Sequence, residues 1–197
     1  PAQRDLIGEL SDACDEKGLG LFLYYSYAAD WKHPYFYPPD AGWNNARPKN
    51  WQNEVLYRWH EDEDFGIYVN FVHAQLRELL TGYGPIAGIW FDPIMGFYAR
   101  PDLFPMEETY ALIRSLQPQT LISFKQGATG NEDFAAPERS GHSLADRVKQ
   151  AFPHNPASYE AAHRAWESNK SKWNEICDTL QPRGWGYIRA DDGRHKT

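Results

Sequence analysis

The sequence lacks the features that mark several large classes of protein. It contains only two cysteines, Cys14 and Cys177, too few for a disulfide framework or a cysteine-rich zinc site. It has no run of Lys and Arg, and its net charge is −7, so it lacks the clustered cations that neutralise phosphates. No stretch approaches the roughly 18 consecutive apolar residues of a membrane span. We therefore expect neither a nucleic-acid nor a membrane partner, and we interpret Cys14 as a small core residue.

Familiar catalytic motifs are missing as well. The chain has no HExxH zinc motif, no phosphate-binding glycine loop and no recognisable Ser-His-Asp order. We therefore expect no metal and no organic cofactor. The first residues, PAQRDL, include neither an initiator Met nor a signal peptide. They indicate a processed or excised segment, and they leave the cellular compartment unknown.

Aromatic residues are abundant, with Trp 8, Tyr 12 and Phe 10 in a chain of 197 residues. This length suits one domain or a piece of a larger one, and the hydrophobic share of 42% suffices for a packed core. Aromatic side chains fill cores, but Trp and Tyr also offer flat apolar faces with a polar edge, which suit sugar rings. Composition alone does not separate these two uses.

Hydrophobic patterns alternate between helical and strand-like periods. They predict helices over residues 4–16, 67–81 and 106–118, and strands over 21–25, 86–91 and 120–124. Residues 26–51 are predicted to form a long loop, and the acidic run at 60–64 a solvated helix start rather than a metal site. Two helices, over 143–152 and 157–168, and a strand region over 172–180 complete the prediction. The alternation indicates an α/β fold with a parallel sheet covered by helices.

Polar residues gather where the predicted strands end. Asp92 closes the run GIWFD and is followed by Pro93, a pair that is also common in turns. Ser26, Trp31 and Lys125 follow the other strands, as do the acids of NEDFAAPE at 131–138. Chemistry in parallel α/β folds lies on the loops after the carboxyl ends of strands. This placement favours a site over a simple turn at Asp92.

Carboxylates and aromatics without other catalytic groups point to glycoside hydrolysis. One carboxylate attacks the sugar or activates water, and a second protonates the leaving oxygen. In a retaining enzyme the two carboxyl groups lie about 5–5.5 Å apart, and the proton donor needs a raised pKa.

Several segments, in their order along the chain, resemble the alpha-L-fucosidases of glycoside hydrolase family 29. They are RDLIGELSDACDEKGLGLFLYYSYAADW, YVNFVHAQLRELLTGYGPIAGIWFD, LIRSLQPQTLISFKQG, EDFAAPE, EICDTL and WGY. The resemblance implies a (β/α)8 TIM-barrel-like catalytic domain, of which residues 1–197 form a single, partial domain from the central and C-terminal part. The family's K-H-H-D-G-F segment and its last strand are absent from this sequence, so missing barrel segments or a homo-oligomer are expected to complete the barrel.

The resemblance also implies roles for individual residues. Asp92 matches the family's nucleophile, although Pro93 replaces the Gly that usually follows it. The acid/base is either Glu138 in EDFAAPE, which we favour, or Glu175 in NEICDT, with Glu132 as a third choice. The implied activity is a retaining exo-glycosidase that removes terminal alpha-L-fucosyl units by double displacement.

Substrate contacts follow from the same resemblance. Tyr25 and Trp31 match positions lining the family's pocket, and Lys125 replaces an Arg that holds the sugar. From chemistry alone, Trp31 or Phe124 is expected to contact the methyl group of fucose. The expected partner is a fucosylated oligosaccharide or glycoconjugate. The alternative is a non-catalytic or inactive carbohydrate-binding fragment, and a related glycosidase acting on galactose also stays open.

Overall fold

The computed structural model describes residues 3–46, 57–137, 143–182 and 184–194. Within these ranges a parallel sheet has the strand order β1–β2–β3, formed by Phe22–Ser26, Gly88–Asp92 and Leu121–Ser123. The helices are α1 (Leu6–Glu16), α2 (Phe65–Gly82), α3 (Ile94–Ala99), α4 (Met106–Leu116), α5 (Leu144–Ala151) and α6 (Pro156–Asn169). Short 3-10 helices lie at Pro39–Ala41, Asn44–Ala46, Asp62–Asp64, Pro101–Leu103 and Arg189–Asp191. The predicted α/β alternation is thus confirmed.

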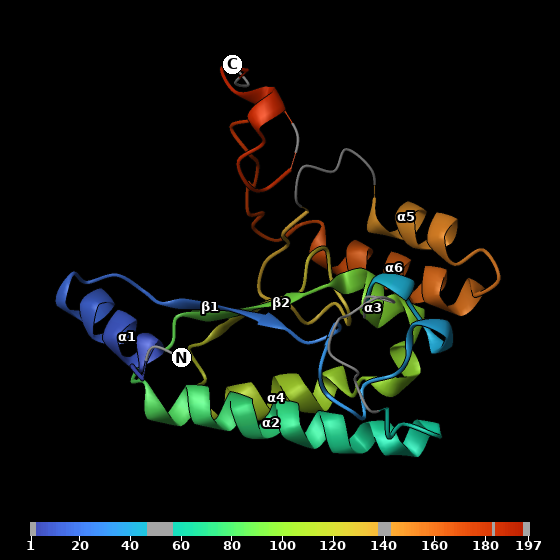
Figure 1. Cartoon of the computed structure of the whole chain (residues 1–197), viewed down its shortest axis with the longest axis horizontal. Coiled ribbons are helices and arrows are strands. Elements are labelled where there is room, and N and C mark those ends of the chain that lie inside the picture. The colour runs from blue at the N-terminus through green and yellow to red at the C-terminus, as the bar shows by residue number, and fades with distance from the viewer. Residues whose placement is uncertain (1–2, 47–56, 138–142, 183, 195–197) are drawn as a thin grey trace.

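One face of the sheet is covered by α2 and α4, which lie side by side beneath the strands (Figure 1). Every second residue of a strand points to the same face, so Ile89 and Phe91 of β2 both meet these helices. Val72 and Leu76 of α2 and Ile113 of α4 complete this fully buried layer. The core of the protein therefore lies between the sheet and these two helices.

The opposite face of the sheet is open in the described structure. Phe22 and Tyr24 of β1 and Leu121 of β3 are 44%, 63% and 43% exposed, although they lie beside buried residues of the same strands. Trp90 and Asp92 of β2 share this face, because β1 pairs with β2 in the register Tyr24↔Trp90 and Ser26↔Asp92. This open face carries the candidate site.

The acidic run at 60–64 begins a helix, as its sequence predicts. Glu61 and Asp64 form a reciprocal capping box around the 3-10 turn Asp62–Asp64, which leads directly into α2. Each carboxylate accepts a backbone N–H that the helix start leaves without a partner. Helix capping therefore accounts for Glu61 and Asp64, while Asp62 pairs with Arg100 at 2.7 Å.

The structure differs from the sequence-based prediction in two segments. The helix α3 directly after Asp92-Pro93 was not predicted, because six residues are too few for a clear helical period. The predicted strand over 172–180 is wrong, since its described contact with the sheet region is a single bridge, Asn174↔Ala135. Cys14 is half-buried and packs against the core, in keeping with its interpretation as a small core residue, although Leu6 and Leu10 of the same helix are exposed.

The loop after β1 contains only short 3-10 turns as far as residue 46, and residues 47–51 of the predicted loop lie outside the described ranges. The two predicted helices near the C-terminus are confirmed as α5 and α6, which pack against each other. None of the helices in the described ranges is long and apolar enough to cross a membrane.

Candidate active site

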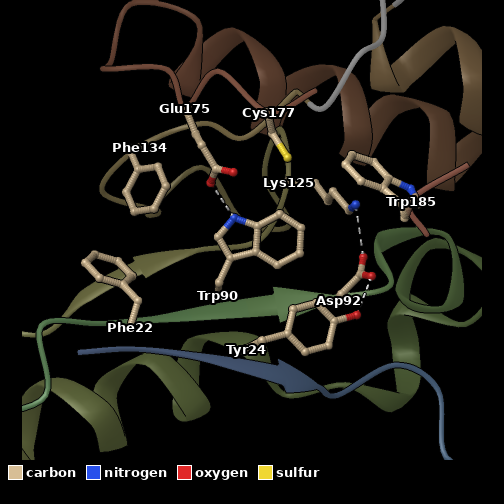
Figure 2. A pocket seen from close by; sticks show the side chains of 9 residues that line it. All are labelled: Phe22, Tyr24, Trp90, Asp92, Lys125, Phe134, Glu175, Cys177 and Trp185. Atoms are coloured by element: carbon tan, nitrogen blue, oxygen red, sulfur yellow. Dashed lines mark hydrogen bonds and ion pairs between the residues drawn. The ribbon is translucent and has the colours of Figure 1, made fainter. Parts of the chain in front are cut away.

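Asp92 is the last residue of β2, and its carboxylate is held between residues of both neighbouring strands (Figure 2). The Tyr24 hydroxyl, from β1, donates a hydrogen bond of 2.7 Å to Oδ2. Lys125 Nζ, two residues beyond β3, lies 3.4 Å from Oδ1. The Asp92 side chain is 19% exposed, so it is oriented by these partners and still reachable from the open face.

Sheet register explains why Tyr24 reaches Asp92. Tyr24 lies opposite Trp90 in the parallel pairing, and the two rings stack with their centroids 5.6 Å apart. The phenol extends along the strand, so its hydroxyl meets the next residue on the same face of β2, which is Asp92. Offset stacking of this kind stabilises an aromatic pair by about 0.5–1.5 kcal/mol beyond its burial. Tyr24 was not among the predicted site residues.

Lys125 contacts both Asp92 and the aromatic surface of the site. Its Nζ lies 4.7 Å from the centroid of the Trp90 ring, within the range of a cation–π interaction. The side chain is only 11% exposed, so the ammonium is largely withdrawn from water. Lys125, which the sequence places after a strand end like Asp92, thus forms an ion pair with the Asp92 carboxylate. Its contact with a sugar is untested.

A cavity of about 670 Å³ opens beside these residues. Its lining joins carboxylates, a cation and several aromatic rings, namely Phe22, Tyr24, Trp90, Asp92, Lys125, Phe134, Glu175, Cys177 and Trp185. Pockets with apolar walls and a few polar groups are typical of small-molecule sites. Trp185, from the segment WGY that resembles the family, also belongs to this lining.

Glu175 shares the cavity with Asp92 (Figure 2). Its Oε2 accepts a 2.8 Å hydrogen bond from Trp90 Nε1, and its backbone N–H donates to the Ala135 carbonyl at 2.8 Å. Glu175 is therefore fixed at both its backbone and its side chain, although it does not belong to a strand. Glu138, the other candidate acid, lies outside the described residues.

A second hollow of about 440 Å³ lies on the other side of Asp92. Trp31 lines it together with Trp43, Asn45 and Asp30, and it shares Tyr24 and Asp92 with the larger cavity. The structure thus brings Trp31 to the neighbourhood of Asp92, in the loop that follows β1.

Two predicted sugar contacts lie away from the cavity. The Tyr25 side chain points to the helix side of the sheet, where its hydroxyl donates to Gln75 Oε1 of α2 at 2.6 Å. Phe124 is 0% exposed and packs against Phe91 and Phe97. The alternation of side chains along a strand sends both residues to the face opposite Asp92. The assignment of Tyr25 and Phe124 to the cavity is therefore corrected.

Glu132, the third candidate acid, does not line the cavity and is only 1% exposed. Its carboxylate accepts hydrogen bonds from Tyr110, Asn169 and backbone N–H groups of residues 128–130. All these partners are donors, so the geometry gives Glu132 a part in holding the loop rather than in proton transfer to a substrate.

Comparisons with known proteins agree on one family. The family model described as Alpha-L-fucosidase matches residues 1–197. Alpha-L-fucosidase 1 of Arabidopsis thaliana is 28% identical over 119 residues, which are 60% of this chain and 18% of that protein. The structure of alpha-L-fucosidase isoenzyme 1 from Paenibacillus thiaminolyticus has a TM-score of 0.60 and 27% identity, covering 100% of this chain and 42% of that one.

A further similar structure is alpha-L-fucosidase AlfC of Lactobacillus casei. A variant of AlfC in complex with Fuca(1,6)GlcNAc has a TM-score of 0.51 and 28% identity, covering 69% of this chain and 41% of that one. This chain therefore spans less than half the length of each of these relatives.

Proposed function

The chain belongs to the alpha-L-fucosidase family, and on that premise we propose that it carries the nucleophile half of a retaining glycosidase active site. The substrate would be a glycan with a terminal alpha-L-fucosyl unit. The observation that carries the proposal is Asp92 at a strand end, bonded to Tyr24 and paired with Lys125, in one cavity with Glu175.

The chemistry takes place in two displacements. A carboxylate oxygen of Asp92 bonds to the anomeric carbon, while the bond from that carbon to the glycosidic oxygen breaks. The departing oxygen takes a proton from a carboxylic acid. That same group, now ionised, removes a proton from water, which displaces Asp92 and releases fucose with retained configuration.

For the proton donor we propose Glu175, with Glu138 as the alternative. What supports Glu175 is its place in the cavity that also contains Asp92, on a wall anchored by Trp90 and Ala135. The bond from Trp90 Nε1 stabilises an acceptor oxygen on Glu175 and leaves its other oxygen for the proton. Glu138 is kept as the alternative on the strength of the family resemblance.

We also propose that residues 1–197 form one partial (β/α)8 barrel domain. Consecutive parallel strands separated by helices support this, as does the open face of the sheet, which carries apolar Phe22 and Leu121. In a closed barrel this face would point inward and be filled by side chains. A substrate would then reach Asp92 at the carboxyl ends of the strands.

Fucosylated glycans are proposed as the substrate class because of the family and because AlfC has been solved in complex with Fuca(1,6)GlcNAc. The aromatic lining of the cavity suits the apolar faces of such sugars. Comparing turnover of aryl alpha-L-fucosides with that of the corresponding galactosides tests the choice of sugar, since galactose adds a hydroxyl at the methyl position.

The deciding experiment is release of nitrophenol from an aryl alpha-L-fucoside by the wild type and by Asp92→Gly, with and without azide. We expect the variant to lose turnover and azide to restore it by replacing the carboxylate as nucleophile. Asp102→Asn, which changes a half-exposed acid in a 3-10 turn, is the control and should keep its activity. Turnover that survives in Asp92→Gly without azide contradicts the proposal, and fucose binding without turnover favours a binding domain.

A further inference from the structure

Lys125 has an unusual backbone conformation for a lysine at a functional site. Its φ is +52°, in the left-handed region that residues with a side chain seldom adopt. Such a conformation costs on the order of 1 kcal/mol or more and persists only where the surrounding structure enforces it. Some part of the protein must therefore hold the backbone on which the Lys125–Asp92 ion pair depends.

The carboxylate of Glu132 holds the segment that follows Lys125. Its Oε1 accepts the backbone N–H groups of Ala128 at 2.7 Å and Thr129 at 3.1 Å, and its Oε2 accepts that of Gly130 at 3.0 Å. Three consecutive N–H groups thus converge on one buried anion. A charge-assisted bond of this kind is roughly twice as strong as a neutral one.

Glu132 also ties this loop to two helices. The Tyr110 hydroxyl of α4 donates to Oε1 at 2.7 Å, and burial followed by the nearby Glu132 charge raises the pKa of this phenol, which keeps its proton. Asn169 Nδ2 of α6 donates to Oε2 at 2.7 Å and also to the Gln126 carbonyl at 3.2 Å. The Gln126 carbonyl belongs to the residue directly after Lys125, so the network ends next to the lysine.

A third tie links the same loop to the segment after Asp92. The Tyr98 hydroxyl of α3 donates to the Gly127 carbonyl at 2.8 Å. Since α3 begins two residues after Asp92, this hydrogen bond connects the segment after Asp92 to the loop after Lys125. The loop between residues 126 and 130 therefore has little freedom to turn Lys125 away.

We infer that Glu132 is a positioning residue, whose buried carboxylate fixes the loop of residues 126–130 and thereby aims Lys125 at Asp92. Glu132 does not line the cavity, and the loop that it holds begins directly after Lys125, whose own carbonyl accepts the Ala136 N–H at 2.7 Å. Asp133, the next acid, differs in its contacts: it accepts the Ile122 N–H at 2.7 Å and pairs with Arg114 at 3.0 Å. Asp133 supports β3 and does not bond to the loop of residues 126–130, which makes it the matched comparison.

The first test measures the position of Lys125 without relying on activity. The full chain is labelled with an acetyl N-hydroxysuccinimide ester, and the rate at Lys125 is followed by peptide mass spectrometry relative to the more exposed Lys170. Glu132→Gln should raise the Lys125 rate about tenfold, because local opening exposes the amine. Asp133→Asn should stay within about twofold. An unchanged Lys125 rate in Glu132→Gln overturns the inference.

Tyr110→Phe serves as the second variant in case Glu132→Gln does not fold. It removes one of the hydrogen bonds to Glu132 and keeps the ring, so it should raise the Lys125 labelling rate by a smaller factor of about two to five. A Lys125 rate equal to that of the wild type in folded Tyr110→Phe contradicts the inference in the same way.

The second test is a double-mutant cycle on hydrolysis of an aryl fucoside, and this part rests on the proposed function. Glu132→Gln should lower kcat/KM by about 10- to 100-fold in the wild type, the range expected for a misplaced active-site group. When Lys125→Met is already present, adding Glu132→Gln should cause no additional loss of kcat/KM, although it should still lower the urea midpoint. Equal losses of kcat/KM in both backgrounds overturn the inference.

Absence of fucosidase activity in the wild type would refute the proposed function, while the labelling result still decides the role of Glu132.

Discussion

Tyr24 and Tyr25 are adjacent in β1 but face opposite sides of the sheet, and we predict that removing their hydroxyls has opposite effects. Tyr24→Phe should impair catalysis and leave stability nearly unchanged. Tyr25→Phe should lower stability and leave catalysis nearly unchanged. Each variant removes one oxygen and keeps the aromatic ring, so the comparison isolates the hydrogen bond that each hydroxyl makes.

The expected loss of catalytic rate in Tyr24→Phe follows from the hydrogen bond of 2.7 Å between the Tyr24 hydroxyl and Asp92 Oδ2. Hydrogen bonds to charged groups contribute about 1.5–3 kcal/mol, and the high exposure of Tyr24 lets water replace part of that. A loss of about 1–2 kcal/mol in orienting the nucleophile corresponds to a fall of about 5- to 30-fold in kcat/KM. The free energy of unfolding should change by no more than about 0.5 kcal/mol, as for other exposed substitutions.

The expected loss of stability in Tyr25→Phe follows from the hydrogen bond of 2.6 Å between the Tyr25 hydroxyl and Gln75 Oε1, on the helix side of the sheet. Removing the donor leaves a half-buried amide oxygen without this partner, at a cost of about 1–2 kcal/mol in the free energy of unfolding. Because the bond lies on the helix side, kcat/KM should stay within about twofold of the wild type.

The assay pairs aryl fucoside kinetics with urea unfolding on the same preparations. Tyr25 and Asp92 lie on opposite faces of neighbouring strands, so removing the Tyr25 hydroxyl should not affect catalysis by Asp92. A drop in kcat/KM of tenfold or more for Tyr25→Phe, with Tyr24→Phe unaffected, would show that the faces of β1 are assigned the wrong way round.

Three further predictions concern the body of the fold. Phe124→Ala should lower the free energy of unfolding by about 3–5 kcal/mol in urea titrations, because the ring is fully enclosed; a loss below 1 kcal/mol would place it at a surface. Burial raises the pKa of Tyr27 to about 12, against an unfolded value of about 10, so the folded state holds this proton more tightly. The stabilisation by this protonated hydroxyl is complete below pH 10 and is lost as the pH rises toward 12. In Tyr27→Phe the urea midpoint should therefore decrease less steeply than in the wild type between about pH 9.5 and 11. A midpoint that decreases as steeply in the variant as in the wild type would contradict this prediction. Gly96→Ala should lower the melting temperature, since its Cβ would lie 2.0 Å from the Ala28 carbonyl oxygen, whereas Gly66→Ala in α2 meets open space and should raise it or leave it unchanged.

The sequence was sufficient to predict most elements, because their patterns are local. Apolar runs of four to six residues between turn residues mark β1, β2 and β3, and long 3.6-residue periods mark α2 and α4. The six-residue α3 is too short to show a period. Residues 172–180 show no strict alternation of apolar and polar residues, since Trp173, Ile176, Cys177 and Leu180 are spaced three or four residues apart. They join the sheet region through one bridge only, so the predicted strand had weak support from the sequence.

Which face of a strand carries the site depends on contacts that are distant in sequence. The neighbours Tyr24 and Tyr25 are chemically equivalent in the sequence, and only the pairing of β1 with β2 shows that Tyr24 shares a face with Asp92. A register argument starting from Asp92 would have found Tyr24, since Ser26 lies opposite Asp92 and Tyr24 is two residues earlier. The same alternation would have excluded Phe124.

The two candidate catalytic carboxylates differ in how the fold supports them. Asp92 ends a central strand, and its partners Tyr24 and Lys125 come from the middle of β1 and from just beyond β3, so all three strands of the sheet determine its surroundings. Glu175 lies outside the sheet and is anchored by one backbone bridge and by the indole of Trp90. A strand-end acid can be recognised from a short sequence pattern because the sheet fixes its position. An acid held by an irregular segment depends on long-range contacts, which a short sequence pattern does not reveal. The strand-end pattern therefore marks Asp92, whereas the family resemblance leaves Glu138, Glu175 and Glu132 as candidates for the proton donor.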